Sequence, residues 1–95
     1  KFDSLTWKSH LNNDDSDPIK LRMVDDLLAR HKLVGMKQTQ INDLLGTPPK
    51  TNYFKHYHYV YWLGPERGWM SIDSEWLALK FDDTGIVTTA EIVRD

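Results

Sequence analysis

The chain has 95 residues, which suits one domain, because two halves of this length would each be too small to bury a stable core without disulfides or metals. Its formal net charge of −2 provides no positive surface for a phosphate backbone or an anionic membrane, which argues against nucleic-acid binding. The sequence has no cysteine, which excludes a disulfide scaffold and a thiolate zinc site, and its longest apolar run, residues 59–63, is far shorter than the roughly 20 residues of a membrane-spanning helix.

Residues 1–17 are expected to form a polar N-terminal tail, consistent with a tether, and residues 18–95 a single domain. The run 12–17 has no apolar period, and its side chains favour local hydrogen bonds to the backbone over regular structure. Four apolar side chains interrupt the tail: Phe2, Leu5, Trp7 and Leu11. Their spacing allows the first half of the tail to lie either against the domain or against a partner. The first residue is Lys rather than Met, and we therefore expect that a tag, a signal peptide or a lipidated segment preceded it.

Residues 18–31 are predicted to form the first helix. Asp17 supplies an acceptor for the free N–H groups of the first turn, and Pro18 fits the position after it. Apolar side chains then recur at steps of three and four residues: Ile19, Met23, Val24, Leu27 and Leu28. This spacing is typical of an amphipathic helix with one side facing a core.

A second, shorter helix is predicted over residues 37–45. Met36 and Ile41 stand where a hydrophobic staple fixes the start of a helix, and Gly46 is suited to end it. Lys37 offers no acceptor to the free N–H groups of the first turn. Packing rather than intrinsic propensity must therefore hold this helix.

Beyond Pro49 the pattern changes from helical to alternating, with many aromatic and β-branched residues. Three strands are predicted from it: residues 53–63, 75–81 and 86–93. The run Asp-Asp-Thr-Gly at 82–85 predicts a tight hairpin between the last two strands. Two helices followed by three strands predict an α+β fold (ααβββ), with the helices packed on one face of a three-stranded antiparallel meander.

Four polar side chains in the predicted sheet are candidates for a metal or acid–base site: His56, His58, Asp73 and Glu75. Each pair shares one face of its strand, and the pairs converge if the strands are neighbours. Carboxylates beside a turn are usually solvated, however, and the sequence has no further ligand at tight spacing. It also lacks a glycine-rich phosphate loop and a Gly-x-Ser-x-Gly nucleophile motif. The sequence therefore predicts a protein that is not an enzyme and holds neither a metal nor a cofactor.

Seven tyrosine and tryptophan residues gather between positions 53 and 76. Two short helices cannot cover so many large rings, so we expect some of them on an open face of the sheet, where Tyr and Trp anchor protein interfaces. The residues expected to bind a partner are Tyr57, Tyr59, Tyr61 and Trp69. The opposite strand face is expected to belong to the core, with Phe54, Val60 and Trp62. The alternative is that the tyrosines only pack on one another across strands.

Short motifs frame the second predicted helix and the last hairpin. Leu-Val-Gly-Met-Lys at 33–37 precedes that helix, Leu-Gly-Thr-Pro at 45–48 closes it, and Phe-Asp-Asp-Thr-Gly-Ile-Val occupies 81–87. Together these motifs resemble the BamE (SmpA/OmlA-like) lipoprotein family, and the resemblance covers roughly residues 19–93. Lys37 departs from the family pattern, which has Thr at the helix start. The β-lactamase-inhibitor-protein modules share this helix–helix–sheet plan.

The resemblance implies a small bacterial lipoprotein that faces the periplasm and is anchored to the outer membrane by a lipidated cysteine upstream of Lys1. It implies a non-catalytic role, in which the protein binds or stabilises an envelope protein complex of the outer-membrane assembly type. The alternative function is an inhibitor or sensor module that binds an enzyme or a cell-wall glycan. Membrane contact is expected only through the anchor. The expected oligomeric state is a monomer or a weak dimer that pairs through an edge strand.

Overall fold

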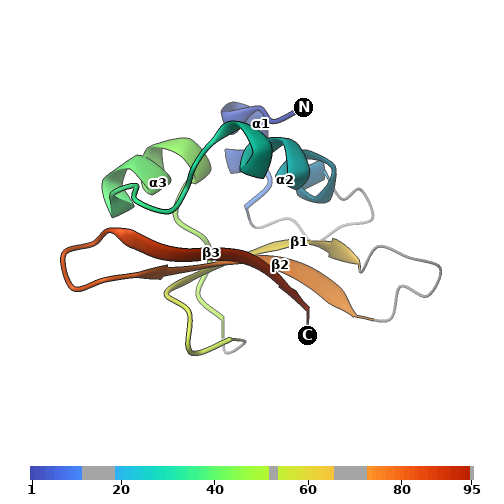
Figure 1. Ribbon diagram of the computed structural model, residues 1–95. Helices are drawn as coiled ribbons and strands as arrows, with labels where there is room; N and C mark the ends of the chain where they lie inside the picture. Colours follow the sequence, from blue (N-terminus) through green and yellow to red (C-terminus); the bar gives the residue numbers. More distant parts are fainter. Residues whose placement is uncertain (12–18, 52–53, 66–72, 95) are drawn as a thin grey trace.

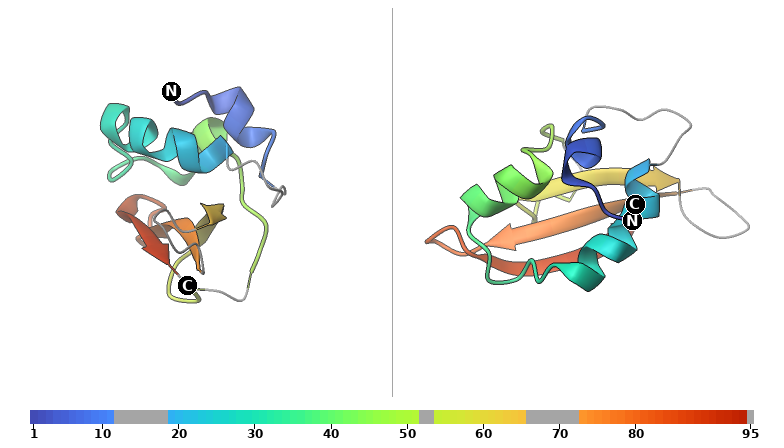
Figure 2. Two further views of the ribbon diagram at one scale, coloured as in Figure 1. Left: turned by 90° about the vertical axis from the view of Figure 1, so that its right-hand side faces the viewer. Right: turned by 90° about the horizontal axis from the view of Figure 1, so that it is seen from above.

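Helices and strands form two layers in the part of the chain that the computed structural model describes, residues 1–11, 19–51, 54–65 and 73–94. The elements follow in the order α1 (Ser4–Lys8), α2 (Ile19–Arg30), α3 (Gln38–Leu45), β1 (Tyr59–Pro65), β2 (Ser74–Phe81) and β3 (Val87–Arg94). The helices lie over one face of the sheet (Figure 1; Figure 2). The sheet is antiparallel with strand order β1-β2-β3. The predicted α+β fold is therefore confirmed, and α1 adds a third helix to the predicted pair.

The main core fills the space between the helices and the sheet. On β1 its members are Tyr61 and Leu63, and on β2 Leu77 and Leu79, because alternate residues of a strand share a face. The helices, the loop after α2 and β3 contribute the other large buried side chains: Trp7, Leu21, Met23, Val24, Leu27, Leu33, Ile41, Leu45 and Val87. Of the apolar period predicted for residues 19–28, Met23, Val24 and Leu27 are buried, whereas the period missed Lys20 and Leu21 on the buried side of α2.

The tight hairpin predicted between the last two strands joins β2 and β3, and a carboxylate holds it. Asp82 Oδ1 accepts hydrogen bonds from the backbone N–H of Ile86 at 3.0 Å and from the backbone and hydroxyl of Thr84 at 2.9 and 2.7 Å. Gly85 takes the left-handed conformation that the turn requires, with φ of +85°. The hydrogen bond from Ile86 and then that from Thr84 lower the pKa of Asp82 below its ordinary value of 3.8.

We expect Asp82→Ala to lower the melting temperature at neutral pH and to reduce the loss of stability in acid. Because its pKa is lowered in the folded protein, the Asp82 carboxylate stabilises the fold above pH 3.8, and this contribution is lost as the pH falls through the lowered pKa. Thermal unfolding as a function of pH, followed by circular dichroism, measures both effects. Asp83→Ala, at an exposed neighbour, is the control. Equal acid sensitivity in the two variants would contradict this role of Asp82.

The predicted start of the first strand is wrong. Strand β1 begins at Tyr59 rather than at residue 53, because the backbone turns first. Phe54 has a left-handed φ of +56°, and the N–H of Tyr57 donates to the Phe54 carbonyl at 2.9 Å. The described part of the connection from α3 to β1 therefore passes to the side of the sheet away from the helices before the strand begins (Figure 1).

The first half of the predicted tail lies against the domain and forms α1. The side chain of Asp3 caps this helix by accepting from the N–H of Leu5 at 3.1 Å. Trp7 is 0% exposed and belongs to the main core. Of the two alternatives open for this segment, packing on the domain is the one that the structure shows. Residues 12–18 lie outside the described part.

Candidate interaction surface

Tyr61, one of the residues expected on an open face, lies in the main core. Its side chain is 1% exposed, its ring is 5.8 Å from the Trp7 ring in an edge-to-face contact, and its hydroxyl donates to the Gly46 carbonyl at 2.6 Å. Burial raises the pKa of this hydroxyl well above its ordinary value. The expected placement of Tyr61 on an open face is wrong because the helices cover this face of β1.

Tyr59 shares the helix-covered face but is only half buried, at the margin of the core. Its hydroxyl donates to Oδ1 of Asn42 at 2.7 Å and accepts from Nε2 of Gln38 at 3.0 Å. Its ring packs edge-to-face on Phe81 with 5.0 Å between centroids. Tyr59 therefore joins the sheet to α3, and the polar atom of its side chain is already engaged within the domain.

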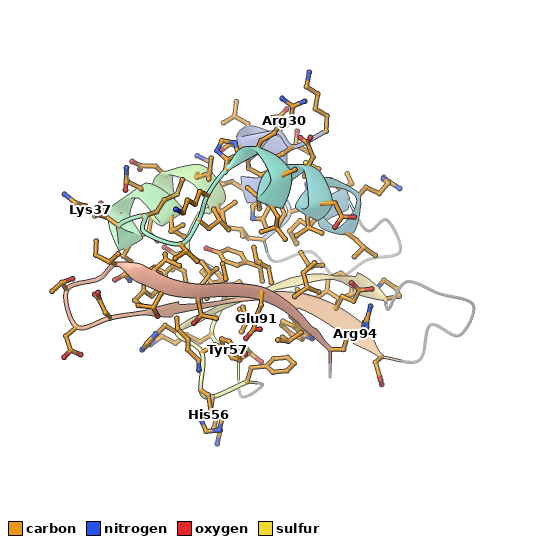
Figure 3. The ribbon with its side chains drawn as sticks, viewed as in Figure 1. Arg30, Lys37, His56, Tyr57, Glu91 and Arg94 are labelled. Atoms are coloured by element: carbon orange, nitrogen blue, oxygen red, sulfur yellow. The ribbon has the colours of Figure 1, made fainter. Side chains whose placement is uncertain are left out.

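Tyr57 lies on the other side of the sheet (Figure 3). Its hydroxyl donates to the carboxylate of Glu91 on β3, and Nζ of Lys80 lies 5.1 Å from the centre of its ring. The hydrogen bond to Glu91 and then burial raise the pKa of Tyr57 above 10.0. The predicted tyrosine surface is thus divided between both sides of the sheet. Trp69, its fourth member, lies outside the described residues.

A second apolar cluster occupies the face of the sheet away from the helices, which we call the far face. It consists of Val60, Trp76 and Ala78 in the centre and of the half-buried Phe54, Tyr57, Trp62 and Val93 around them. Trp62 on β1 pairs with Trp76 on β2, and Trp76 pairs with Val93 on β3. The far face therefore carries one apolar row across all three strands.

The chain segment before β1 covers only part of the far face. The Phe54 ring contacts the Trp76 ring edge-to-face at 5.8 Å, and Trp76 is 9% exposed. Trp62, on the edge strand β1, stays partly open to solvent. The expectation that Trp62 belongs to the main core is wrong. Sequence reasoning missed it because both faces of residues 57–63 carry large apolar side chains, so alternation does not tell which face the helices cover.

The histidines and carboxylates considered for a metal or acid–base site do not converge. His58 stands beside Phe81, whose N–H donates to the histidine Nδ1 at 2.9 Å. Glu75, at the opposite end of β2, is 0% exposed, and its Oε2 is 3.7 Å from Nη2 of Arg94. His56 and Asp73 are exposed. Among the residues with described positions, His, Cys, Asp and Glu form no group of three that could hold a metal ion.

Comparison with known proteins identifies the family. The sequence profile of the outer membrane protein assembly factor BamE domain matches residues 23–91, which run from α2 into β3 and leave α1 outside. The protein is also 35% identical over 66 residues to Aquaporin-2 from Saccharomyces cerevisiae, a match that covers 67% of this chain and 23% of that protein. None of the described helices is long and apolar enough to cross a membrane.

No solved structure matches this chain, so the likeness to β-lactamase-inhibitor-protein modules stays a prediction. The BamE profile, in contrast, covers well over half of the sequence. It agrees with the short motifs at residues 33–48 and 81–87 and with the order of helices and strands. The chain therefore belongs to the BamE family of outer membrane protein assembly factors, which are non-catalytic envelope proteins that work with other envelope proteins.

Proposed function

We propose that this chain is a non-catalytic periplasmic protein that binds a protein complex of outer-membrane assembly through the far face of its sheet. A lipid anchor upstream of Lys1 is part of the same proposal. The observation that carries it is the partly exposed indole of Trp62 at the end of an apolar row, on the face that the described helices leave uncovered. The family supports a protein partner.

The far face has the composition of a protein interface. Its centre is apolar and aromatic, and Tyr57, Lys80 and Glu91 form a polar margin around part of it. Complete burial of a large apolar side chain contributes about 1.5–3 kcal/mol, and Trp62 has part of this gain still available. Trp62 is therefore the side chain that we expect to contribute most to partner binding. Tyr57 is expected at the border of the contact, whereas Tyr59 and Tyr61 support the fold behind it.

Site-specific photocrosslinking in cells tests this surface. A photoreactive residue at position 62 is expected to form an adduct with a component of the outer-membrane assembly machinery. The same residue at Ala29, which is exposed on α2, is the control and is expected to form none. Trp62→Ala should reduce capture of that component at least severalfold, whereas Leu5→Ala, at the 76% exposed leucine of α1, should leave capture unchanged. Equal capture by both variants would refute the assignment of the far face.

The same partly exposed indole favours the alternative of a cell-wall glycan, because sugar rings stack on open aromatic faces. Titration with peptidoglycan fragments, followed by tryptophan fluorescence, separates the two functions. A saturable change that Trp62→Ala abolishes would support the glycan. No change in tryptophan fluorescence over the titration would exclude the peptidoglycan fragments and favour the protein complex as the ligand of this surface.

A further inference from the structure

The short helix α1 rests on a surface formed by the other two helices. Seen from above, α1 lies next to both α2 and α3 (Figure 2). Its Trp7 passes through the helical layer and contacts Tyr61 on the sheet. Residues 1–11, which include α1, contact a surface that we call the α1 seat: Met23 and Asp26 of α2, Asp43 and Leu44 of α3, Gly46 and, at the bottom, Tyr61.

Polar contacts define what the α1 seat recognises. On the α2 side, the N–H of Phe2 donates to a carboxylate oxygen of Asp26 at 2.6 Å. On the α3 side, the hydroxyl of Ser4 donates to the Leu44 carbonyl at 2.6 Å, and Nζ of Lys8 donates to the Asp43 carbonyl at 2.9 Å. These carbonyls belong to the last turn of α3, where the helix dipole favours positive charge. The seat therefore suits a short segment with a large apolar side chain followed by a basic one.

Trp7, the residue that α1 buries in this seat, fits the seat incompletely. The indole Nε1 of Trp7 is buried without a hydrogen-bond acceptor among the described residues, and burying such a donor carries a desolvation cost. An anchor without a polar atom, such as Phe or Leu, avoids this cost. Beside α1 there is also an open depression of about 310 Å³, lined by Ser4, His31, Met36, Gln40, Asp43 and Leu44. A larger segment than α1 has room to extend into it.

The way in which α1 is connected to the rest of the chain also makes it easy for another segment to displace it. A five-residue helix is unstable by itself, and the chain from α1 to α2, residues 9–18, packs Leu11 on the main core before a run, 12–17, that has no apolar side chain. The matched family domain, residues 23–91, contains every residue of the seat but not α1. The match begins inside α2 and ends inside β3, so its limits are not element boundaries, but every residue of the seat lies within it.

We propose that the α1 seat is a binding site for a short helical segment of another protein, one that bears a Phe or Leu anchor with a basic residue beside it, and that α1 is a displaceable occupant of this site. The seat lies on the opposite side of the molecule from the far face. An experiment that overturns one of the two proposals therefore does not affect the other.

Fluorescence polarisation on the full chain tests the proposal. The probes are two labelled peptides, one with the sequence of residues 1–11 and one that carries Trp7→Phe. Each peptide is added to two proteins, the unchanged chain and the double variant Asp3→Ala/Ser4→Ala. The double variant weakens the cap and one contact of α1 but leaves the seat intact. We expect the Phe peptide to bind the double variant about tenfold more tightly than the unchanged chain, because less α1 competes. We also expect the Phe peptide to bind each protein more tightly than the peptide that keeps Trp7.

Asp26→Ala, placed in the double variant, should weaken peptide binding, whereas Asp83→Ala in the hairpin should not. If the double variant fails to fold, excess Phe peptide added to the unchanged chain should accelerate hydrogen exchange in α1 and not in β2. Equal affinity of the peptide for both proteins, or no binding to either, would overturn the proposal. A double variant that dimerises and does not bind the peptide would also overturn it, since the occupant would then be a second copy of this chain.

Discussion

Replacing Tyr61 by alanine is expected to lower the free energy of unfolding by about 3–5 kcal/mol, the usual cost of truncating a large buried aromatic side chain. The ring is 1% exposed and lies between Trp7 and the sheet. Its loss leaves a cavity below the helices, and the Gly46 carbonyl loses the hydroxyl that donates to it. Urea unfolding, followed by far-ultraviolet circular dichroism, measures the change.

Two further variants identify the cause of this loss. Tyr61→Phe removes only the hydroxyl and should cost about 1 kcal/mol, the typical contribution of one hydrogen bond. Trp62→Ala, at the adjacent residue on the far face, should cost less than half of the Tyr61→Ala value, because its indole is only half buried. A larger loss for Trp62→Ala than for Tyr61→Ala would mean that the helices cover the other face.

Trp7→Ala is expected to lower the free energy of unfolding by about 1.5–3 kcal/mol, the contribution of one fully buried large apolar side chain. Trp7 is 0% exposed, and its ring contacts both Phe2 and Tyr61. The loss is limited because α1 can leave the domain without unfolding it. Guanidinium unfolding measures the stability, and native-state hydrogen exchange should show faster exchange in α1 than in β2.

Leu5→Ala is the matched control for this prediction. Leu5 lies in the same short helix, but its side chain is 76% exposed, so the change should stay within about 0.5 kcal/mol. Trp7→Phe should be less destabilising than Trp7→Ala, because it keeps most of the apolar surface and removes a buried donor. Unchanged stability in Trp7→Ala would show that α1 does not contribute to the core.

The local signals in the sequence predicted the elements well. The apolar period of α2, the glycine that ends α3 and the Asp-Asp-Thr-Gly turn are all short-range features, and each acts through neighbouring residues. The start of β1 was missed because Phe54 adopts a left-handed backbone conformation that its residue type does not indicate. Helix α1 had a signal in Asp3, an N-cap residue four positions before Trp7, but the segment is too short for a periodic pattern.

The candidate surface was harder to predict because it depends on which side of the sheet the helices cover. Residues 59–63 place Tyr59 and Tyr61 on one face and Val60 and Trp62 on the other, and either set is apolar enough to form a core. Trp7 determines which face of β1 is covered, since it extends the helical layer over Tyr61. That contact joins residues far apart in the sequence, and a pattern of neighbours does not reveal it.

Nuclear Overhauser spectroscopy on the labelled full chain tests most directly which face of the sheet the helices cover. The structure predicts cross-peaks between the ring protons of Tyr61 and those of Trp7, whose centroids are 5.8 Å apart. It predicts that the long-range cross-peaks of the Trp62 ring lead to far-face residues such as Trp76. Cross-peaks that connect the Trp62 ring to α1, α2 or α3, with none from Tyr61 to these helices, would contradict the account.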